Sequence, residues 1–228
     1  MQKMTIVDEK FYGRLKSRSL TKRQSELFDT LFPKLEIKTF TDIEQALPNY
    51  DKVLLEIGFG SGEHLAQMAR SHPADLFIGC EPFVNGVASL LIKIDEEKIQ
   101  NIRVYQRDAR FLIKELPNNF LDGVFLLFPD PWPKRKHIKR RFLQDKTITD
   151  IYTRLKPGAF WRVASDHKEY RNWILKMFGQ DKFRGLFTAE LFDRRTRPSE
   201  ETWAKTRYER KAEDEILYAI YTKVIDGE

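Results

Sequence analysis

Short apolar runs alternate with segments of helical periodicity along most of the chain. Continuous apolar runs are typical of strands that are covered on both faces. The runs that predict strands are Val53–Ile57, Leu76–Cys80, Ile102–Tyr105, Val124–Phe128 and Phe160–Ala164, followed by 183–192 and 216–224. Helical patterns cover 62–72, 84–99, 109–116, 141–155 and 167–179. The alternation predicts an α/β fold: a mostly parallel sheet with helices on both faces and an antiparallel last strand.

The N-terminal segment lacks the alternating pattern that marks the rest of the chain. Residues 1–20 are polar and basic without apolar periodicity, which predicts a flexible basic arm. Thr21 can cap a helix that runs through Leu31 and stops at Pro33. Because there is no internal repeat and no low-complexity linker, residues 21–228 are expected to form a single domain.

The composition indicates the cellular compartment in which the protein is expected. The single cysteine, Cys80, cannot form an internal disulfide, which favours a reducing compartment. No apolar run approaches the roughly 18 residues that a membrane span needs, and the N-terminus has no apolar signal core. We therefore expect a cytoplasmic protein without a membrane partner. No Cys/His cluster has zinc-ligand spacing, so no metal is expected.

The positive charge is clustered. The net charge is +6, which favours a polyanionic partner, although 34 acidic residues weaken that inference when it rests on composition alone. The densest cluster is the tract Lys134-Arg-Lys-His-Ile-Lys-Arg-Arg141. Further basic residues lie in two other segments: Arg14, Lys16, Arg18, Lys22 and Arg23 near the N-terminus, and Arg194, Arg195 and Arg197. Together they could hold a folded RNA by its backbone, but such runs are often only solvated surface.

The first predicted strand ends in Gly58-Phe-Gly-Ser-Gly62, with glycine at every second position. Such a turn lets a ligand approach bare backbone. A dinucleotide fingerprint would need glycine at position 63, where the chain has Glu63. A carboxylate there disfavours a phosphate at the helix N-terminus, so we expect a ligand without phosphate rather than a nicotinamide cofactor.

Acidic residues lie at the ends of the first three strands. Glu56 precedes the glycines, Glu81 ends the second strand and Asp108 follows the third. Glu81 is placed to accept the hydroxyls of a ribose, and Asp108 could accept an adenine amino group. Asp108 could instead cap the helix that begins at Ala109. A ligand with a ribose, an adenine and a cationic tail, but no phosphate, is S-adenosylmethionine.

The fourth strand leads into Phe128-Pro-Asp-Pro-Trp-Pro133. The prolines stiffen this loop, and Trp132 offers a face on which a base could stack. A proline-rich turn with a core-packed tryptophan is the alternative. The loop puts the carboxylate of Asp130 beside the glycine turn in the sheet order that such folds usually take, and the basic tract follows directly.

These motifs resemble those of the bacterial tRNA (guanine-N7)-methyltransferases, a class I family with a Rossmann-like sheet. The resemblance covers nearly the whole chain. It rests on Leu55–Gly62, Gly79-Cys-Glu81, Phe128–Trp132 with Lys134, Lys139–Phe142, Ser165-Asp166 and Thr206-Arg-Tyr-Glu209, and on Gly13-Arg-Leu15 and Leu20-Thr-Lys22. Pro133 and Arg207 are small departures, because the family often has a polar or histidine residue at the first position and lysine at the second.

The resemblance implies transfer of a methyl group from S-adenosylmethionine to N7 of guanine 46 in the variable loop of tRNA. It further implies a catalytic Asp130, a monomer or homodimer, and no obligatory protein partner. The implied cofactor-binding residues are Glu56, Gly58, Gly60, Glu81, Asp108 and Asp130. The implied substrate-binding residues are Lys134, Asp166, Thr206, Arg207, Tyr208 and Glu209. The implied RNA contacts are Lys136, His137, Ile138, Lys139, Arg140 and Arg141.

Three alternatives stay open at this point. The chain could methylate another RNA base or a small amine, although the basic tract disfavours a small substrate. It could also be a noncatalytic RNA-binding protein on this fold, although such a protein would have no use for a pocket that suits a cationic cofactor. Asp166 could act only as a cap for the helix that begins near His167.

Overall fold

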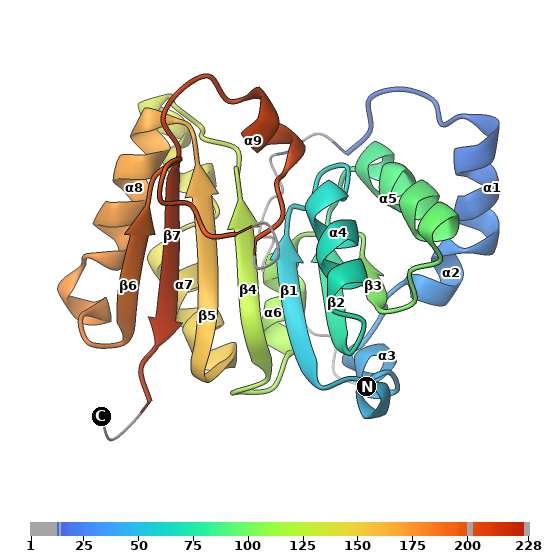
Figure 1. Cartoon of the computed structure of the whole chain (residues 1–228), viewed down its shortest axis with the longest axis horizontal. Coiled ribbons are helices and arrows are strands. Elements are labelled where there is room, and N and C mark those ends of the chain that lie inside the picture. Colours follow the sequence, from blue (N-terminus) through green and yellow to red (C-terminus); the bar gives the residue numbers. More distant parts are fainter. Residues whose placement is uncertain (1–12, 14, 200–202, 226–228) are drawn as a thin grey trace.

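The computed structural model describes residue 13 and residues 15–199 and 203–225. These residues form a seven-stranded sheet with the strand order β3-β2-β1-β4-β5-β7-β6 (Figure 1). The strands are β1 (Lys52–Ile57), β2 (Asp75–Cys80), β3 (Ile102–Tyr105), β4 (Leu121–Leu127), β5 (Leu155–Ser165), β6 (Phe187–Phe192) and β7 (Leu217–Lys223). The first five strands are parallel, and β7 runs antiparallel between β5 and β6. The predicted α/β fold is confirmed.

Helices cover both faces of the sheet (Figure 1). One buried core contains side chains of α6, α7 and α8, and a second core on the other face contains side chains of α1, α2, α4 and α5. The α-helices are α1 (Lys22–Thr30), α2 (Phe32–Leu35), α3 (Phe40–Glu44), α4 (Glu63–Ser71), α5 (Val84–Glu97), α6 (Ala109–Glu115), α7 (Asp145–Arg154), α8 (Lys168–Phe178) and α9 (Arg207–Lys211). The 3-10 helices are η1 (Leu47–Asn49), η2 (Arg135–Arg140) and η3 (Asp181–Phe183). None of the helices in the described part of the chain is long and apolar enough to cross a membrane.

The strand order locates the ligand-binding edge. The chain runs outward from β1 through β2 to β3, and then returns to place β4 on the other side of β1. Ligands in open α/β sheets bind outside the carboxyl ends of the strands at such a reversal. The loops after β1, β2 and β4 therefore meet at one edge, and these are the loops that carry the glycines and the acidic residues.

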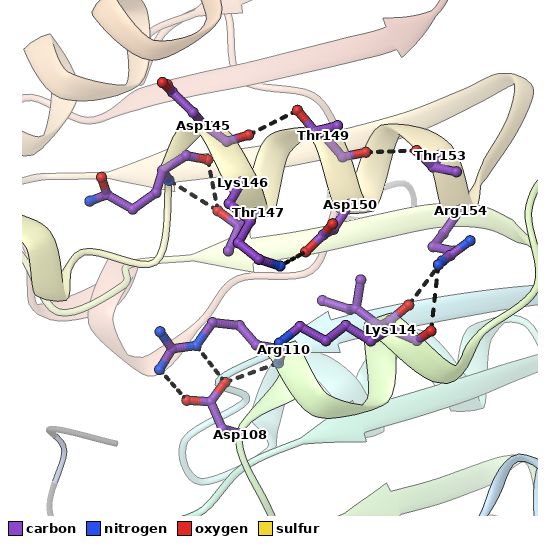
Figure 2. A network of polar contacts seen from close by, with 12 residues as sticks. Asp108, Arg110, Lys114, Asp145, Lys146, Thr147, Thr149, Asp150, Thr153 and Arg154 are labelled. Atoms are coloured by element: carbon purple, nitrogen blue, oxygen red, sulfur yellow. Dashed lines mark hydrogen bonds and ion pairs between the residues drawn. The ribbon is translucent and has the colours of Figure 1, made fainter. Parts of the chain in front are cut away.

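Polar contacts tie the C-terminal end of α6 to that of α7, at the opposite edge of the sheet where β4 and β5 begin (Figure 2). Arg154, in the last turn of α7, donates from Nε to the carbonyl of Ile113 at 3.0 Å and from Nη2 to the carbonyl of Lys114 at 3.5 Å. Carbonyls in the last turn of a helix have no partner within the helix, so these donors satisfy groups that would otherwise need water. The contacts fix the end of α6 against α7.

The start of the domain follows its local sequence. Thr21 caps α1, as predicted: its Oγ1 accepts from the Gln24 N–H at 3.3 Å, and the Gln24 side chain accepts from the Thr21 N–H at 3.0 Å. Residues 1–12 and 14 of the predicted arm lie outside the described residues. Residues 15–18 lie against the start of α5, where the Asn85 side chain accepts from the Ser17 N–H and donates to the Arg18 carbonyl, both at 3.0 Å.

The helix predicted over 141–155 begins later, at Asp145. The Thr147 hydroxyl accepts from the Gln144 N–H at 3.0 Å, and the Gln144 side chain pairs with the Thr147 backbone, a capping box that defines a start at this position. The preceding tract forms η2 instead. The strand predicted at 183–192 begins at Phe187, after η3, and α9 lies in a segment for which no helix was predicted.

The strand predicted at Phe160–Ala164 is longer, because β5 already begins at Leu155 and continues through Pro157 and Gly158. Its pairing with β4 shifts register between Leu121 and Gly123, and Gly158 has a φ of 76°. A bulge tolerates both a residue without an N–H and a left-handed conformation. The Lys-Pro-Gly signal therefore ends the helix, as predicted, but does not interrupt the strand.

Candidate active site

The glycine turn after β1 has a left-handed backbone. Gly58, Gly60 and Gly62 have φ angles of 70°, 57° and 74°, a region that other residues rarely adopt. Gly86 of α5 packs against this turn so closely that a Cβ on it would stand 2.3 Å from the Gly60 carbonyl oxygen. The turn and α5 thus make backbone-to-backbone contact. Sequence reasoning did not use Gly86, although a glycine inside a helical pattern can signal such a contact.

Glu81 both builds this turn and borders the cavity in front of it. One carboxylate oxygen accepts from the Gly60 N–H at 2.8 Å, and the other accepts from the Phe83 N–H at 2.9 Å. Burial raises the pKa of Glu81 to about 6, against the lowering effect of the two backbone donors, with Asp130 and Glu56 as further negative charges nearby. Each carboxylate oxygen keeps lone-pair capacity for another donor.

Glu56 lies behind the turn rather than in front of it. Its carboxylate is 4% exposed and lies 2.7 Å from Nδ1 of His64, which is 2% exposed. The Glu56 side chain does not line the cavity described below. The structure therefore gives Glu56 a buried partner on the first turn of α4, and any effect of its charge on a ligand acts from behind the glycine turn.

Asp108 caps α6, the role that competed with cofactor binding. It accepts from the Arg110 N–H at 2.9 Å, and its carboxylate pairs with the Arg110 guanidinium through bonds of 2.9 and 2.6 Å (Figure 2). Asp108, Ala109 and Arg110 nevertheless border the same cavity. Asp108 thus caps α6 and also borders the cavity. Arg110 adds a positive charge that was not predicted at this site.

The loop after β4 has a strained backbone. Phe128 and Trp132 have φ angles of 51° and 39°, which costs free energy in residues with a side chain. Asp130, between these two residues, is exposed toward the cavity, and desolvation of its carboxyl raises the pKa above its usual range. The Trp132 ring is half-buried, with the Arg140 guanidinium 5.0 Å from its centre and the His137 ring at 5.7 Å. The Trp132 ring, predicted to stack on a base, therefore already contacts two residues of the basic tract.

One cavity of about 520 Å³ brings these elements together. It lies at the carboxyl ends of β1, β2 and β4, with Tyr208 on the side of α9. Of the predicted cofactor-binding residues, all but Glu56 line it: Gly58, Gly60, Glu81, Asp108 and Asp130. Gly13 lines it as well, so a residue of the N-terminal segment reaches the site. Pockets of roughly 300–1,000 Å³ bind ligands of cofactor size.

The basic tract divides into exposed and buried residues. Lys136 and Lys139 are exposed on η2, whereas His137 and Ile138 are half-buried. Desolvation and the cations Arg140, Lys136 and Lys134 lower the pKa of His137. Arg141 is buried and bonded to backbone, so it does not share a surface with the exposed lysines.

The segment Thr206–Glu209 divides in the same way. Thr206 caps α9, with its hydroxyl accepting from the Glu209 N–H at 2.9 Å. Glu209 is buried and accepts from Tyr218 at 2.8 Å and from Arg197 Nε at 2.5 Å. Arg207 and Tyr208 are exposed, and a Tyr208 ring carbon lies 3.7 Å from where a Cβ of Gly60 would stand. Only this middle pair faces outward.

Two arginines of the third basic patch bind the protein itself. Arg197 is bound to Glu209 and to the Trp203 carbonyl, and Arg194 donates to the carbonyls of Ala212 and Asp214. Both arginines hold the segment between β6 and β7 in place. Arg194 nevertheless stays exposed, whereas Arg197 is half-buried. The irregular segment has few backbone partners of its own and takes donors from arginine side chains.

Lys134 and Asp166 lie outside the cavity lining. Lys134 is exposed, directly before η2. Asp166 is half-buried after β5, on the same edge of the sheet. The cap that Asp166 was considered for is not formed, since α8 has His167 at its N-cap and no side-chain cap bond. In the described part of the chain, no group of three or more His, Cys, Asp or Glu side chains is arranged to hold a metal ion.

The sequence is similar to those of known proteins. Residues 50–217 match a protein family described as "Putative methyltransferase". A tRNA (guanine-N(7)-)-methyltransferase of Zymomonas mobilis is 42% identical over 224 residues, covering 94% of each chain. One of Caulobacter vibrioides is 42% identical over 203 residues, covering 88% of each.

Solved structures agree on the fold. An antibiotic-related methyltransferase superposes with a TM-score of 0.58 at 13% identity, covering 83% of this chain and 96% of the other. The 16S rRNA methyltransferase KamB superposes with a TM-score of 0.57 at 17% identity, covering 80% and 93%. These two show the class I methyltransferase architecture alone, whereas the sequence relatives show the family. The chain belongs to the tRNA (guanine-N7)-methyltransferases.

Proposed function

We propose that this protein transfers a methyl group from S-adenosylmethionine to N7 of guanine 46 in the variable loop of tRNA. The observation that carries the proposal is the cavity that joins the glycine turn, Glu81 and Asp130 at one edge of the sheet, directly beside an exposed basic helix. The activity named for the relatives supports a guanine N7 target. The resemblance to the family supports position 46, and we infer a cytoplasmic location from a tRNA substrate.

The residues at the cavity fit S-adenosylmethionine. The glycine turn leaves bare backbone at Gly58 and Gly60, and Glu81 presents a carboxylate to a pair of hydroxyls. Glu63 opens α4, where a phosphate would otherwise bind, so the site suits a ligand that carries none. When bound, S-adenosylmethionine supplies a methyl group activated by a positively charged sulfur. Glu81 and Asp130 then keep negative charge close to a cationic ligand.

Asp130 orients the base and compensates charge. Guanine N7 has a lone pair and no proton, so no general base is needed to expose the nucleophile. Methylation leaves positive charge on the purine, and a carboxylate at the cavity mouth stabilises it. Its oxygens can also accept from the N–H groups of guanine. Alignment of the reacting atoms then carries much of the rate enhancement.

Exposed side chains of two segments near the cavity hold the RNA. Lys136 and Lys139 lie on η2, which follows the β4 loop, while Arg207 and Tyr208 lie on α9. Lys134 and Asp166 lie at the same edge without lining the cavity. A duplex hides N7 in the major groove. This arrangement therefore favours recognition of an accessible loop base by the exposed residues of η2 and α9.

The test is methyl transfer from labelled S-adenosylmethionine to unmodified tRNA, with the site mapped by borohydride reduction and aniline cleavage at 7-methylguanine. Cleavage at one variable-loop guanine, lost when that guanine is replaced, is the expected result. Labelled RNA without this cleavage would move the target to another atom or base. Cofactor binding without any labelling of tRNA would contradict the proposed substrate.

A further inference from the structure

Arg141 is the one member of the basic tract that the structure buries. It follows η2 directly and is 4% exposed. Its Nε donates to the Pro131 carbonyl at 2.9 Å, and its Nη2 reaches the Trp132 carbonyl at 3.4 Å. Pro131 is the residue after Asp130, so the guanidinium grips the loop immediately beside the carboxylate that faces the cavity.

The guanidinium is fixed by α8. It lies 5.1 Å from the ring centre of Trp173 and 5.6 Å from that of Tyr170, and Nη2 is 3.7 Å from a carboxylate oxygen of Glu169. Trp173 itself donates to the Leu143 carbonyl at 2.8 Å, just beyond Arg141. The loop, Arg141 and a regular helix thus form one connected unit, in which the planar fork has little freedom to turn toward solvent.

The loop needs such an external donor. Pro129, Pro131 and Pro133 have no N–H group, so the loop can make few backbone hydrogen bonds of its own. Phe128 and Trp132 hold positive φ angles of 51° and 39°. Residues with side chains persist in such conformations only when surrounding contacts impose them. A charged donor that binds two successive carbonyls is a contact of that kind.

We propose that Arg141 positions Asp130 for methyl transfer and does not contact RNA. The exposed lysines of η2 bind phosphate, while Arg141 holds the adjoining loop in its strained shape. The tract therefore has two functions that its sequence does not distinguish. The proposal rests on the proposed function for its kinetic part, because turnover is the quantity that a misplaced Asp130 lowers.

The kinetic test uses Arg141→Met, Arg141→Lys and, as the matched phosphate-contact control, Lys139→Gln. We expect both Arg141 variants to lower turnover at saturating tRNA by about 10- to 100-fold, since small misplacements of a reacting group have effects of this size. Lysine keeps the charge but lacks the fork, so it should not rescue turnover. Cofactor affinity, measured by calorimetry, should stay within about 3-fold, and this also reports folding.

The salt dependence of tRNA binding separates the two roles. Losing one phosphate contact lowers the slope of log K against log salt by roughly 0.7 to 0.9. We expect this decrease for Lys139→Gln and an unchanged slope for Arg141→Met. A shallower slope for Arg141→Met, rescue of turnover by Arg141→Lys, or wild-type turnover in both variants would overturn the proposal.

A second measurement needs no variant at all. Phenylglyoxal modifies accessible arginines, and the modified sites can be mapped by mass spectrometry in the wild-type protein with and without tRNA. Arg141 should remain unmodified in both states, while the exposed Arg135 reacts and serves as the reference. Modification of Arg141 that tRNA suppresses would overturn the proposal. Because this readout does not involve methyl transfer, it holds even if the proposed reaction fails.

Discussion

The two segments that border the cavity, 130–141 and 203–211, are anchored by side chains of opposite charge. On the β4 side, the buried Arg141 binds carbonyls of a proline-framed loop. On the α9 side, the buried Glu209 binds Arg197 and Tyr218. In each segment one charged residue is turned inward, and its neighbours Lys139 or Arg207 are exposed.

Arg141 and Glu209, the two anchoring residues, differ in the groups that their removal would leave without a partner. Loss of Arg141 leaves two carbonyls without their donor, but no buried charge of opposite sign, because Glu169 is well exposed. Loss of Glu209 leaves Arg197 as an uncompensated cation that is 9% exposed. The α9 anchor should therefore matter mainly for stability, and the β4 anchor mainly for the geometry of Asp130.

The largest effect is expected for Glu209→Ala. Removing one partner of a buried ion pair costs about 3–5 kcal/mol, so the free energy of unfolding should fall by that amount. Urea denaturation checks this. The double variant Glu209→Leu with Arg197→Met, which removes both charges, should be less destabilised than Glu209→Ala. A loss below about 1 kcal/mol in the single variant would mean that Glu209 is not an anchor.

Asp130→Ala should come next, because Asp130 is the exposed group that the β4 anchor serves. We expect turnover to fall by about 100- to 1000-fold, the effect of removing one group that stabilises transition-state charge. The dissociation constant of S-adenosylmethionine should change by less than about 3-fold. Asp130→Asn keeps the shape and removes the charge, so it separates orientation from charge compensation. Equal losses of turnover and cofactor affinity would show that Asp130 is chiefly a cofactor ligand.

Glu81 combines both roles, since it holds the glycine turn and faces the cavity. Its carboxylate has a pKa of about 6 in the free protein, so it is ionised at pH 7 and mostly protonated at pH 5. Affinity for S-adenosylmethionine should therefore fall as the pH drops through 6, by about 10-fold between pH 7 and pH 5. Calorimetry across this range measures it. The control Glu81→Gln should bind weakly with a flat profile, and a flat profile in the wild type would contradict the role of the charge.

The smallest effect is expected for Arg207→Gln, the exposed neighbour of Glu209. Affinity for tRNA should fall by about 3-fold, with a salt slope lower by roughly 0.7 to 0.9. The free energy of unfolding should change by no more than about 0.5 kcal/mol, as for other surface positions. Lys34→Gln on α2, which removes one charge away from the cavity, is the matched control. A large loss of stability in Arg207→Gln would contradict the distinction between the buried Glu209, which anchors the segment, and the exposed Arg207, which faces RNA.

Much of the site follows from local sequence. Apolar runs that end in glycine, glutamate or Pro-Asp-Pro predict both the strands and the edge where their ends meet, because parallel strands place successive carboxyl ends together. The structure confirms that Gly58, Gly60, Glu81, Asp108 and Asp130 share one cavity. The capping of α1 by Thr21 is also local, and was predicted.

The failures concern charge in irregular segments. Arg197 and Arg141 were expected to face solvent or RNA, yet both donate to backbone carbonyls. Arg141 is buried and Arg197 is half-buried. Sequence periodicity assigns faces only within regular helices and strands, so it gives no direction for a side chain in a loop. The helix α9 was not predicted for a related reason, since five residues are too few to show a helical period.

The sequence by itself determined the fold, the edge of the sheet at which the cavity lies and the family, because strand ends, turn residues and their order are local properties that the chain carries directly. Only the tertiary structure decided which charges bind ligands and which bind the protein. Lys139 and Arg141 are two residues apart and both basic, but α8 supplies aromatic walls and a carboxylate for Arg141. A buried cation must find such partners, and they come from a helix almost thirty residues away in sequence.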